Sequence, residues 1–240
     1  MTSKGKRALI TGASSGIGAA TAVAFAKAGI HLALVSRSSE KLEKVAATAR
    51  QHGVEADVFP CDLLELDRVS ERMASLAEKV CGIDILVNNA GMGYTGTITE
   101  TPLQDWQRTI DLNLLSVVEC VRGVLPSLRA KDSTTIVNVV SIAGKQAFPN
   151  WGAYSASKFA LLGFSQALAA EERENGIRVT ALCPGAVNTP IWETDTVNAD
   201  FDRSKMLTPE IVAESILHVV QLPDSAVVEE LVLMPNGGAF

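Results

Sequence analysis

The sequence is poor in the residues that metal centres and disulfide frameworks require. It holds three histidines and four cysteines in 240 residues. The cysteines, Cys61, Cys81, Cys120 and Cys183, are too widely spaced for a metal-binding pattern. No metal site is therefore expected, and no histidine receives a ligand role. Because most of the cysteines lie in apolar runs, we interpret them as small buried hydrophobic residues.

Long hydrophobic runs and basic clusters are also missing. No apolar stretch is long enough to cross a bilayer, and no signal peptide is apparent before the apolar run that begins at Arg7. The formal net charge is −6 without a basic stripe, which argues against a nucleic-acid partner. We expect a cytoplasmic protein that binds neither a membrane nor nucleic acid.

Apolar residues, by contrast, make up 47% of the chain, which is ample for a hydrophobic core at this length. Residues 1–240 fit one domain, because no repeat, low-complexity tract or linker divides them. Apolar runs alternate with amphipathic stretches throughout, which is typical of a parallel sheet with helices on both faces. The predicted fold class is therefore α/β, as a single doubly wound domain.

The expected strands are Arg7–Thr11, Leu32–Ser36, Glu55–Cys61, Ile83–Val87, Thr134–Ser141, Arg178–Cys183 and Leu231–Met234. The longest expected helices run from Leu103 to Arg129 and from Gly152 to Glu174. Residues that could carry chemistry stand at or just after the strand ends: Thr11, Ser36, Asp62, Asn88, Ser141 and Pro184. Because the carboxyl ends of parallel strands meet at one edge of the sheet, we expect these residues to converge on a ligand site there.

A glycine-rich turn, G-A-S-S-G-I-G at residues 12–18, follows the first expected strand and precedes a helix-like stretch. This order is typical of dinucleotide binding. The glycines let the backbone approach a pyrophosphate, and the helix N-terminus offers N–H donors and positive potential. A tight turn without a ligand would look the same, and the spacing differs from the commoner G-x-G-x-x-G. The residues expected to contact the cofactor here are Gly12, Ser14, Ser15, Gly16, Ile17 and Gly18.

The end of the second expected strand indicates which dinucleotide binds. An acidic residue that holds the ribose hydroxyls of NAD is expected about 20 residues beyond the glycines, but none stands at the strand end. Arg37 stands there between Ser36 and Ser38, and a guanidinium beside two hydroxyls suits the 2′-phosphate of NADP. Glu40 lies nearby, and Arg37 could instead be a solvated loop charge. We predict NADP(H) as the cofactor.

Tyr154 and Lys158 lie four residues apart in an expected helix, so they share one face about a turn apart. A free tyrosine titrates near pH 10 and is a poor acid or base at neutral pH. A lysine cation beside it favours the phenolate and is expected to depress the tyrosine pKa. The pair could then move a proton to or from a substrate oxygen, although such pairs also pack simply as amphipathic side chains.

With these residues the chain resembles the short-chain dehydrogenase/reductase family over nearly its whole length. Thr11 and the glycine turn match the family's cofactor turn, and residues 88–91 match its N-N-A-G segment. Pro184-Gly185 with Thr189 match its P-G-x-x-x-T segment. The family's catalytic tetrad is matched in order and spacing by Asn113, Ser141, Tyr154 and Lys158. The ordered set is far more specific than any one motif.

The resemblance implies a seven-stranded Rossmann-like sheet in the order 3-2-1-4-5-6-7 and hydride exchange between nicotinamide C4 and a carbinol or carbonyl carbon. It implies that Tyr154 donates or removes the proton on the substrate oxygen. Lys158 would depress the tyrosine pKa and bind the nicotinamide ribose. Ser141 would orient the substrate oxygen, and Asn113 would help hold a water that links the lysine to solvent.

Further cofactor contacts follow from the same resemblance. Asp62, followed by Leu63, matches the adenine-contacting position, but could equally be the N-cap of a helix beginning near Glu65. Asn89, Ala90 and Gly91 would line the adenosine ribose and the cofactor floor, whereas Asn88 would fix the sheet internally. The implied contacts beside the nicotinamide are Pro184, Gly185, Val187 and Thr189.

Three segments are expected to frame a small-molecule carbonyl substrate: Met92 to Thr99, Ile142 to Trp151, and Ala186 to Met206. The third is long enough to act as a lid that excludes water. Its aromatic residues, Trp192 and Phe201, favour an apolar or bulky carbonyl compound, or else pack the lid to the body.

A general NADP-dependent carbonyl or hydroxy-acid dehydrogenase is the preferred interpretation. A 3-oxoacyl-acyl-carrier-protein reductase shares the overall pattern and the N-G-G ending at residues 236–238. Those reductases tend to carry an arginine for the acidic carrier where this chain has Ala170, although Arg129 and Lys131 remain as carrier contacts. A non-catalytic NADP sensor or scaffold is disfavoured, because the tyrosine and the lysine are both present.

The family's usual dimers and tetramers imply a homo-oligomer. In the run L-L-G-F-S-Q-A-L at residues 161–168, apolar side chains occupy more than one helix face. This pattern fits burial against both a partner and the sheet, and it fits a buried core helix equally well.

Overall fold

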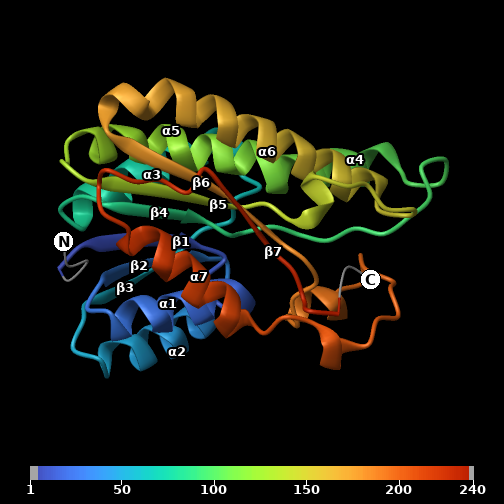
Figure 1. The fold of residues 1–240 in the computed structure, drawn as a ribbon, viewed down its shortest axis with the longest axis horizontal. Helices are drawn as coiled ribbons and strands as arrows, with labels where there is room; N and C mark the ends of the chain where they lie inside the picture. The colour runs from blue at the N-terminus through green and yellow to red at the C-terminus, as the bar shows by residue number, and fades with distance from the viewer. Residues whose placement is uncertain (1–4, 238–240) are drawn as a thin grey trace.

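Seven parallel strands in the order β3-β2-β1-β4-β5-β6-β7 form the centre of the computed structural model, which describes residues 5–237 (Figure 1). This confirms the expected fold class and strand order. The first strand has the expected bounds, and the bounds of the others differ from the expected ones by at most two residues. The strands are β1 (Arg7–Thr11), β2 (His31–Ser36), β3 (Ala56–Pro60), β4 (Ile85–Asn88), β5 (Thr134–Val139), β6 (Ile177–Pro184) and β7 (Glu230–Leu233).

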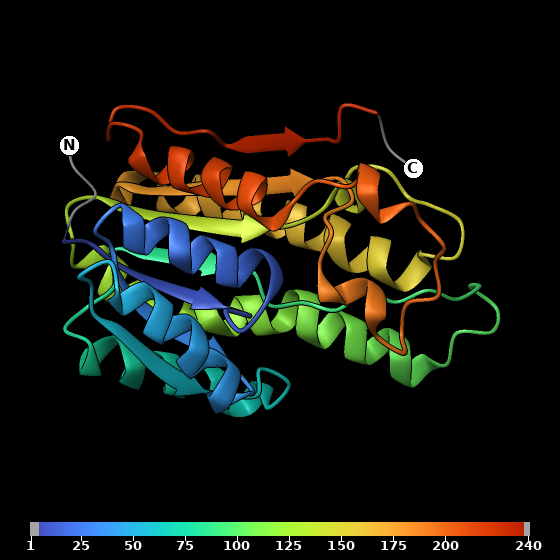
Figure 2. The same cartoon turned by 90° about the horizontal axis from the view of Figure 1, so that it is seen from below.

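Helices cover both faces of the sheet, with α1, α2 and α7 on one face and the remaining helices on the other (Figures 1 and 2). Alternating residues of β1 therefore enter different cores: Ala8 and Ile10 pack with the first group, and Leu9 with the second. No helix within residues 5–237 is long and apolar enough to span a bilayer. The helices are α1 (Gly16–Lys27), α2 (Ser39–Arg50), α3 (Leu66–Lys79), α4 (Leu103–Ile110), α5 (Ser116–Arg129), α6 (Gly152–Glu172) and α7 (Pro209–Gln221).

The segment expected as a helix from Leu103 to Arg129 is helical throughout, as predicted, but it is not a regular α-helix over its whole length. A π-helical turn, Asp111–Leu115, separates α4 from α5. Asn113 lies inside this turn and is fully buried. Such wide turns insert one extra residue into a helix, and they occur frequently at functional sites.

A chain of buried amides connects the central strands to α6. Asn88 Nδ2 donates to Asn138 Oδ1 at 2.9 Å, and Asn138 Nδ2 donates to Ser165 Oγ at 2.9 Å. Asn88 thus joins β4 to β5, and through Asn138 to the helix, as the sequence predicted. Burying amides is costly unless they are hydrogen-bonded, so this chain of bonds favours one relative placement of the two strands and the helix.

Charged groups at the amino edge of the sheet are paired. Glu172 at the end of α6 accepts two hydrogen bonds from Arg129 at 2.9 and 2.5 Å, and Lys131 lies 4.0 Å from Asp84. Arg129 and Lys131 precede β5, whereas Ser141 follows it, so they lie one strand length, roughly 20 Å, from the opposite edge. Their expected use as carrier contacts stays a prediction, and both cations already have a carboxylate partner.

The interpretation of the cysteines holds for three of the four. Cys61, Cys120 and Cys183 are buried, whereas Cys81 is exposed and has a φ of 60° at the end of α3. A short apolar run does not reveal that a residue occupies the left-handed turn after a helix.

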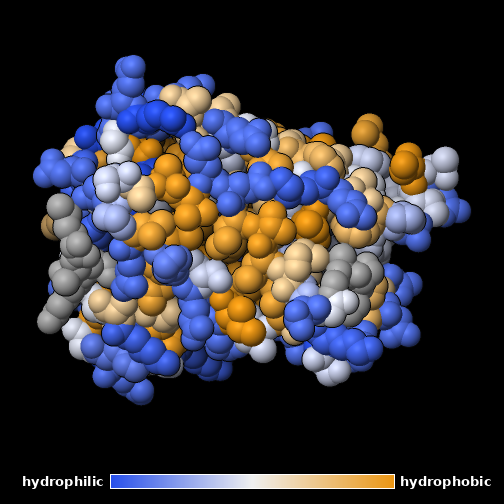
Figure 3. Space-filling view, in the orientation of Figure 1, coloured by the Kyte–Doolittle hydropathy of each residue, from blue (hydrophilic) through white to orange (hydrophobic). Residues whose placement is uncertain are grey.

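The face that carries α7 and β7 has hydrophobic side chains across its centre and hydrophilic ones around its margins (Figure 3). Val232 on β7, Val227 before it and Ile211 on α7 are each more than 40% exposed. Within residues 5–237, β7 pairs only with β6, so one side of this strand is a sheet edge that no other described strand covers.

Candidate functional site

The turn between β1 and α1 approaches its neighbours more closely than a side chain would allow. Gly12 and Gly16 have positive φ angles of 65° and 54°, which glycine adopts without a steric cost. A Cβ added to Gly18 would lie 2.4 Å from the carbonyl oxygen of Gly12. The turn therefore exposes backbone rather than side chains at the carboxyl edge of the sheet.

The side chain of Asn89, which follows β4, holds this turn by hydrogen bonds to its backbone. Its Nδ2 donates to the carbonyl oxygens of Thr11 at 3.0 Å and Gly12 at 3.2 Å, and Thr11 Oγ1 accepts from the backbone N–H groups of Asn89 and Ala90. The Asn89 amide thus supports the cofactor turn; its expected contact with the adenosine ribose remains a prediction.

The N-terminus of α1 has the properties of an anion site. Ser15 makes no side-chain capping bond, and the first turn of the helix holds no acid. The first N–H groups of a helix lack intrahelical partners and carry positive potential. A Cβ on Gly16 would lie 3.1 Å from Thr189 Cγ2. The glycine turn and the segment after β6, which the sequence assigned to the pyrophosphate and the nicotinamide of one cofactor, therefore meet at this helix end.

The end of β2 offers polar groups without partners. The hydroxyl of Ser36 is buried and has no hydrogen-bond partner within the described chain. Arg37 is exposed and makes no ion pair with any described residue, because Glu40 pairs with Lys44 at 2.7 Å instead. Ser38 caps α2 by accepting a bond from the N–H of Lys41. An orphaned hydroxyl beside a free guanidinium fits a ribose phosphate.

Asp62 does not cap α3, so that alternative was wrong. Its Oδ1 accepts a hydrogen bond from the N–H of Leu64 at 3.1 Å, while α3 begins later, at Leu66, with Glu65 in the N-cap position. The Asp62 carboxylate therefore stabilises the turn at residues 62–64, which precedes the helix. Leu63 is buried beside it, and the adenine contact of this pair remains a prediction.

The four predicted catalytic residues converge at the carboxyl edge. Ser141 follows β5, Tyr154 and Lys158 lie one turn apart on α6, and Asn113 lies in the π turn. Lys158 Nζ is 5.7 Å from the centroid of the Tyr154 ring. A Cβ on Gly91 would lie 3.0 Å from Asn113 Oδ1 and 3.8 Å from Lys158 Nζ. The segment after β4 therefore lies against the lysine and the asparagine.

Three of the bonds that hold these side chains involve groups that the sequence did not mark. Lys158 Nζ donates to the carbonyl oxygen of Val139 at 3.0 Å. Asn113 Nδ2 donates to Met92 O and to Ser157 Oγ, each at 3.0 Å. A backbone carbonyl carries no residue-type signal, and a serine in a helix is too common to be one.

Burial determines the charge states at the site. It lowers the pKa of Lys158 to about 8, because desolvation disfavours the ammonium. Burial also raises the pKa of Tyr154, while a hydrogen bond from Ser141 opposes the rise. The expected depression of the tyrosine pKa by the lysine is therefore not found in the chain alone, since desolvation of the phenol dominates. Tyr154 is a protonated donor at neutral pH.

A row of aromatic rings continues outward from Tyr154. Trp151 contacts Tyr154 edge to face at 5.4 Å between centroids and Trp192 at 5.9 Å, and Trp192 contacts Phe201 at 5.3 Å. Trp192 and Phe201 belong to the expected lid, residues 186–206, whose two ends are joined by the bridge between Val187 and Leu207.

The lid also bonds to the segment after β4. The N–H of Thr95 donates to the carbonyl of Thr196 at 2.9 Å, and the N–H of Asn198 donates to Thr95 Oγ1 at 2.7 Å. Arg203 ties the lid to the cofactor-side segment by donating to Asn188 Oδ1 and to the carbonyl of Thr189. Sequence reasoning missed Arg203, since an arginine in a long loop has no distinguishing pattern.

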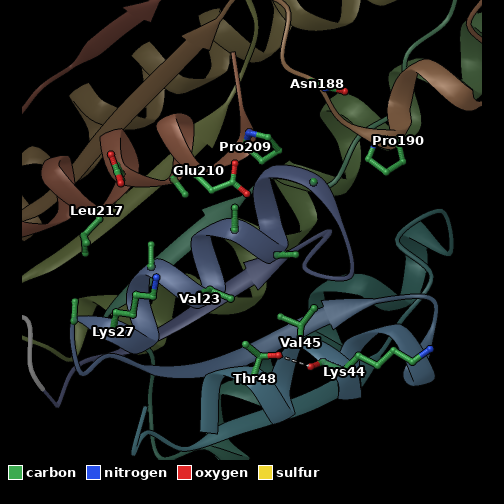
Figure 4. Close-up of a pocket in the computed structure, with 17 residues that line it drawn as sticks. Val23, Lys27, Lys44, Val45, Thr48, Asn188, Pro190, Pro209, Glu210 and Leu217 are labelled. Carbon is green, nitrogen blue, oxygen red and sulfur yellow. Dashed lines mark hydrogen bonds between the residues drawn. The ribbon is translucent and has the colours of Figure 1, made fainter. Parts of the chain in front are cut away.

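A groove of substantial size lies outside this constellation. It has a volume of about 790 Å³ and runs between α1, α2 and α7 (Figure 4). Small residues of α1 form its floor, among them Ala20, Val23 and Ala24, and Gly16 and Pro190 stand at the end nearest the glycine turn. None of the four predicted catalytic residues lines it. Among residues 5–237, no group of three or more His, Cys, Asp or Glu side chains could hold a metal ion.

Comparison with known families gives one match, which covers most of the chain. Residues 6–199 match the family model described as short chain dehydrogenase. An uncharacterized oxidoreductase of Staphylococcus saprophyticus is 35% identical over 233 residues, which cover 96% of this chain and 97% of that protein. A glycine betaine reductase of Emericella nidulans is 33% identical over 238 residues, but the chain spans only 19% of its length. Oxidoreductases of Mycobacterium tuberculosis are likewise longer, and the chain spans 65% of them.

Solved structures agree with this match. An alcohol dehydrogenase of Thermococcus sibiricus, complexed with 5-hydroxy-NADP, has a TM-score of 0.88 at 31% identity, and the match covers 96% of this chain and 97% of that one. An L-sorbose reductase of Gluconobacter frateurii, complexed with NADPH and L-sorbose, has a TM-score of 0.88 at 31% identity, with 99% and 98% covered.

Proposed function

The chain belongs to the short chain dehydrogenase family, and from this membership we propose that it reduces a bulky carbonyl compound to the corresponding alcohol, with Tyr154 as the proton donor. It is an oxidoreductase that acts on alcohol and carbonyl groups, and its cofactor is NADP(H). The nucleotides bound in the two structural neighbours support the same cofactor assignment that Arg37 gave at the strand end.

The residues at the carboxyl edge fit this cofactor. We assign the diphosphate to the glycine turn and the free N-terminus of α1, and the 2′-phosphate to Ser36 and Arg37, whose polar atoms lack partners within the described chain. We assign the nicotinamide side to Lys158 and to the segment from Pro184 to Thr189, which lies against Gly16. When bound, NADPH supplies the hydride that adds to the carbonyl carbon.

The chain's own residues then handle the proton and the oxygen. Tyr154 gives its phenolic proton to the substrate oxygen, which acquires a pair of electrons as the hydride adds to carbon. The ammonium of Lys158 stabilises the phenolate left behind, because an opposite charge nearby favours the ionised form. Ser141 holds the substrate oxygen, and Asn113 positions Met92 and Ser157 around the lysine.

One observation carries the proposal: a phenol whose pKa is raised by burial stands beside a buried ammonium, at the sheet edge where the cofactor turn lies. A protonated donor beside a cation suits reduction rather than oxidation at neutral pH. The same observation counts against a non-catalytic sensor, which needs neither group.

A 3-oxoacyl-acyl-carrier-protein reductase is the second candidate, favoured by its overall sequence pattern. Arg129 and Lys131 give it no support, because they lie at the amino edge and are paired there with Glu172 and Asp84. Gly238, the last residue of the similar ending, lies outside the described residues.

We also propose that the protein forms a homo-oligomer in the cytoplasm. Exposed apolar side chains at Val227 and Val232, beside the free edge of β7, support self-association. The four free cysteines support a reducing compartment. Sedimentation of the purified protein measures the oligomeric state, and a monomer at micromolar concentration contradicts it.

An NADPH-oxidation screen tests the function. The panel holds aldehydes, ketones, quinones, keto acids and acetoacetyl-carrier thioester, and each is assayed with the wild type and with Tyr154→Phe. We expect fast turnover of at least one compound that is not a thioester. The variant is expected to lose about 10²- to 10⁴-fold in turnover while its Kd for NADPH stays within about twofold.

Two results contradict the proposal. Fastest turnover with the carrier thioester selects the second candidate. NADPH binding without oxidation by any carbonyl selects the sensor.

A further inference from the structure

Three aromatic rings outside the predicted tetrad form a wall that starts at the proton donor. Trp151 stands at the N-cap of α6 against Tyr154, Trp192 lies in the 3-10 turn Pro190–Glu193, and Phe201 follows later in the lid. Successive rings meet edge to face with centroids 5.3 to 5.9 Å apart, within the range that aromatic pairs prefer. All three rings are partly exposed, so part of each remains available to a ligand.

The two indoles are held in place before any substrate arrives. Trp192 Nε1 donates to the carbonyl oxygen of Val187 at 2.7 Å. Trp151 is bridged to Gly96, whose N–H donates to the carbonyl of Asn150 at 2.7 Å. Binding of a ligand ring to side chains that are already fixed costs less conformational entropy than binding to mobile side chains.

The charged side chains around the aromatic wall disfavour binding of an anionic substrate. The three substrate-framing segments hold four acids and three bases. Each base already has a carboxylate partner: Arg203 pairs with Glu193 at 2.7 Å, Lys205 with Asp202 at 3.4 Å, and Lys145 with Glu230. No cation of these segments is therefore free to receive a carboxylate or a phosphate, and the excess acid repels one.

We propose that the substrate is an uncharged ketone or aldehyde that carries an aromatic ring beside the carbonyl, and that Trp151 and Trp192 select for this ring. The inference rests on the carbonyl reduction proposed above and specifies its substrate class. The ring packs on the two indoles while the carbonyl oxygen reaches Tyr154. Hydroxy acids, acyl-coenzyme A and carrier thioesters are disfavoured, since each brings negative charge that no cation of the substrate-framing segments is free to neutralise.

Four small α-keto compounds separate the two parts of the inference. Ethyl benzoylformate is aromatic and uncharged, benzoylformate is its anion, and ethyl pyruvate and pyruvate are the same pair without the ring. With NADPH and the wild-type protein, we expect kcat/KM for ethyl benzoylformate to exceed that for ethyl pyruvate at least tenfold and that for benzoylformate at least a hundredfold. Equal or faster reduction of either anion, or of ethyl pyruvate, overturns the inference.

Variants then identify the residue that selects the ring. Trp192→Ala is expected to lose at least tenfold in kcat/KM for ethyl benzoylformate and less than threefold for ethyl pyruvate, whereas Trp192→Phe keeps most of the preference. Leu103→Ala, which removes an exposed apolar side chain outside the three substrate-framing segments, serves as the control and leaves both values unchanged. An equal loss for both esters overturns the selective role of Trp192.

The failures are distinguishable. If Trp192→Ala no longer binds NADPH, the comparison of Trp192→Phe with the wild type and the four-compound series still decides the question. Oxidation of NADPH by other carbonyls of the screen but by none of these four overturns the aromatic inference and leaves the proposed function standing. Oxidation by no carbonyl overturns both.

Discussion

A buried charged side chain lies at each edge of the sheet. At the amino edge, Glu172 is 2% exposed, and its carboxylate accepts two hydrogen bonds from Arg129. At the carboxyl edge, Lys158 is 6% exposed, and its ammonium donates to a backbone carbonyl. The pKa of Glu172 is lowered chiefly by its bond to Arg129, and that of Lys158 is lowered by burial. For an acid, a lowered pKa means that the charge is stabilised; for a base, it means that the charge is destabilised. The folded chain therefore gives the charge of Glu172 an oppositely charged partner, whereas it buries the charge of Lys158 without one among the described residues.

Other groups follow this division only in part. Near the amino edge, the buried guanidinium of Arg178 donates to the carbonyl of Leu222 and to Thr135 Oγ1, each at 2.8 Å. Burial nevertheless lowers the pKa of Arg178, and the buried Thr134 hydroxyl has no partner within residues 5–237. Near the carboxyl edge, the Ser36 hydroxyl has no partner within residues 5–237, and the N-terminus of α1 has no side-chain cap. The unpartnered groups of the carboxyl edge lie beside a glycine turn that exposes backbone, so this edge is the one prepared for a ligand.

Replacing the buried cation has the largest expected effect. Lys158→Met is expected to reduce kcat/KM at least 10²-fold, yet to raise the free energy of unfolding without cofactor by about 1–2 kcal/mol at pH 7. Its folded pKa is lowered from 10.5 to about 8, so the unfolded chain binds more protons between those values. The lysine's contribution to stability therefore rises with pH across that window and is least favourable below it. Urea denaturation measures the gain, and a loss of stability would place Lys158 with the satisfied charges.

Changing the strand-end charge at Arg37 comes next. Arg37→Asp is expected to lower the ratio of kcat/KM for NADPH to that for NADH by about 10²-fold, because a charge-assisted bond to the phosphate becomes a repulsion. Steady-state kinetics with both nucleotides measures the ratio. Lys41→Asp makes the same change of charge on exposed α2 and is expected to shift the ratio less than threefold. An unchanged ratio in Arg37→Asp means that another group binds the phosphate.

The amino edge is tested through Glu172. Glu172→Ala is expected to lower the free energy of unfolding by about 1–3 kcal/mol, a range that allows for solvation of the half-exposed Arg129. Activity per folded molecule stays unchanged. The neighbouring, exposed Glu171→Ala is expected to change stability by less than about 0.5 kcal/mol. A loss of activity at constant folded fraction would mean that the two edges are coupled.

The smallest expected effect is a pH dependence. As the pH rises through the lowered pKa of Lys158, about 8, the ammonium that stabilises the phenolate is lost. We expect kcat/KM for NADPH in carbonyl reduction to fall about tenfold from pH 7 to pH 9, since this parameter reports groups of the free enzyme. A rate that rises over this range would assign the titration to another group.

The sheet and the identity of the site were predictable from the sequence because they rest on residue type and order. Apolar runs gave the strands, and their ends placed the glycine turn and Ser141 at one edge of the sheet. The tyrosine–lysine pair was recognised from its helical spacing and from the family resemblance. What failed depended on three-dimensional detail. Asp62 precedes α3 by too many residues to cap it, and the direction of the Tyr154 pKa depends on how far the phenol is removed from water.

The substrate wall was only half predictable. Trp192 and Phe201 were recognised as lid residues, but Trp151 was only the end of another segment, and sequence spacing does not show that the three rings touch. Their edge-to-face contacts join residues up to 41 positions apart. The pairing of Arg203, Lys205 and Lys145 with acids, which argues against anionic substrates, is equally invisible before folding.

The wide turn from Asp111 to Leu115 adds a residue to a rod that otherwise advances by about 100° per residue. Upstream of it, Asp105 accepts the hydroxyl of Tyr94 at 2.9 Å, and downstream of it Val117 and Val121 pack in the core. Deleting one residue there would let the rod run straight but would rotate its two halves out of phase. The π turn therefore sets the rotation of one half of the helix relative to the other. The second half packs in the core through Val117 and Val121, while the first half contacts a substrate-framing segment at Tyr94.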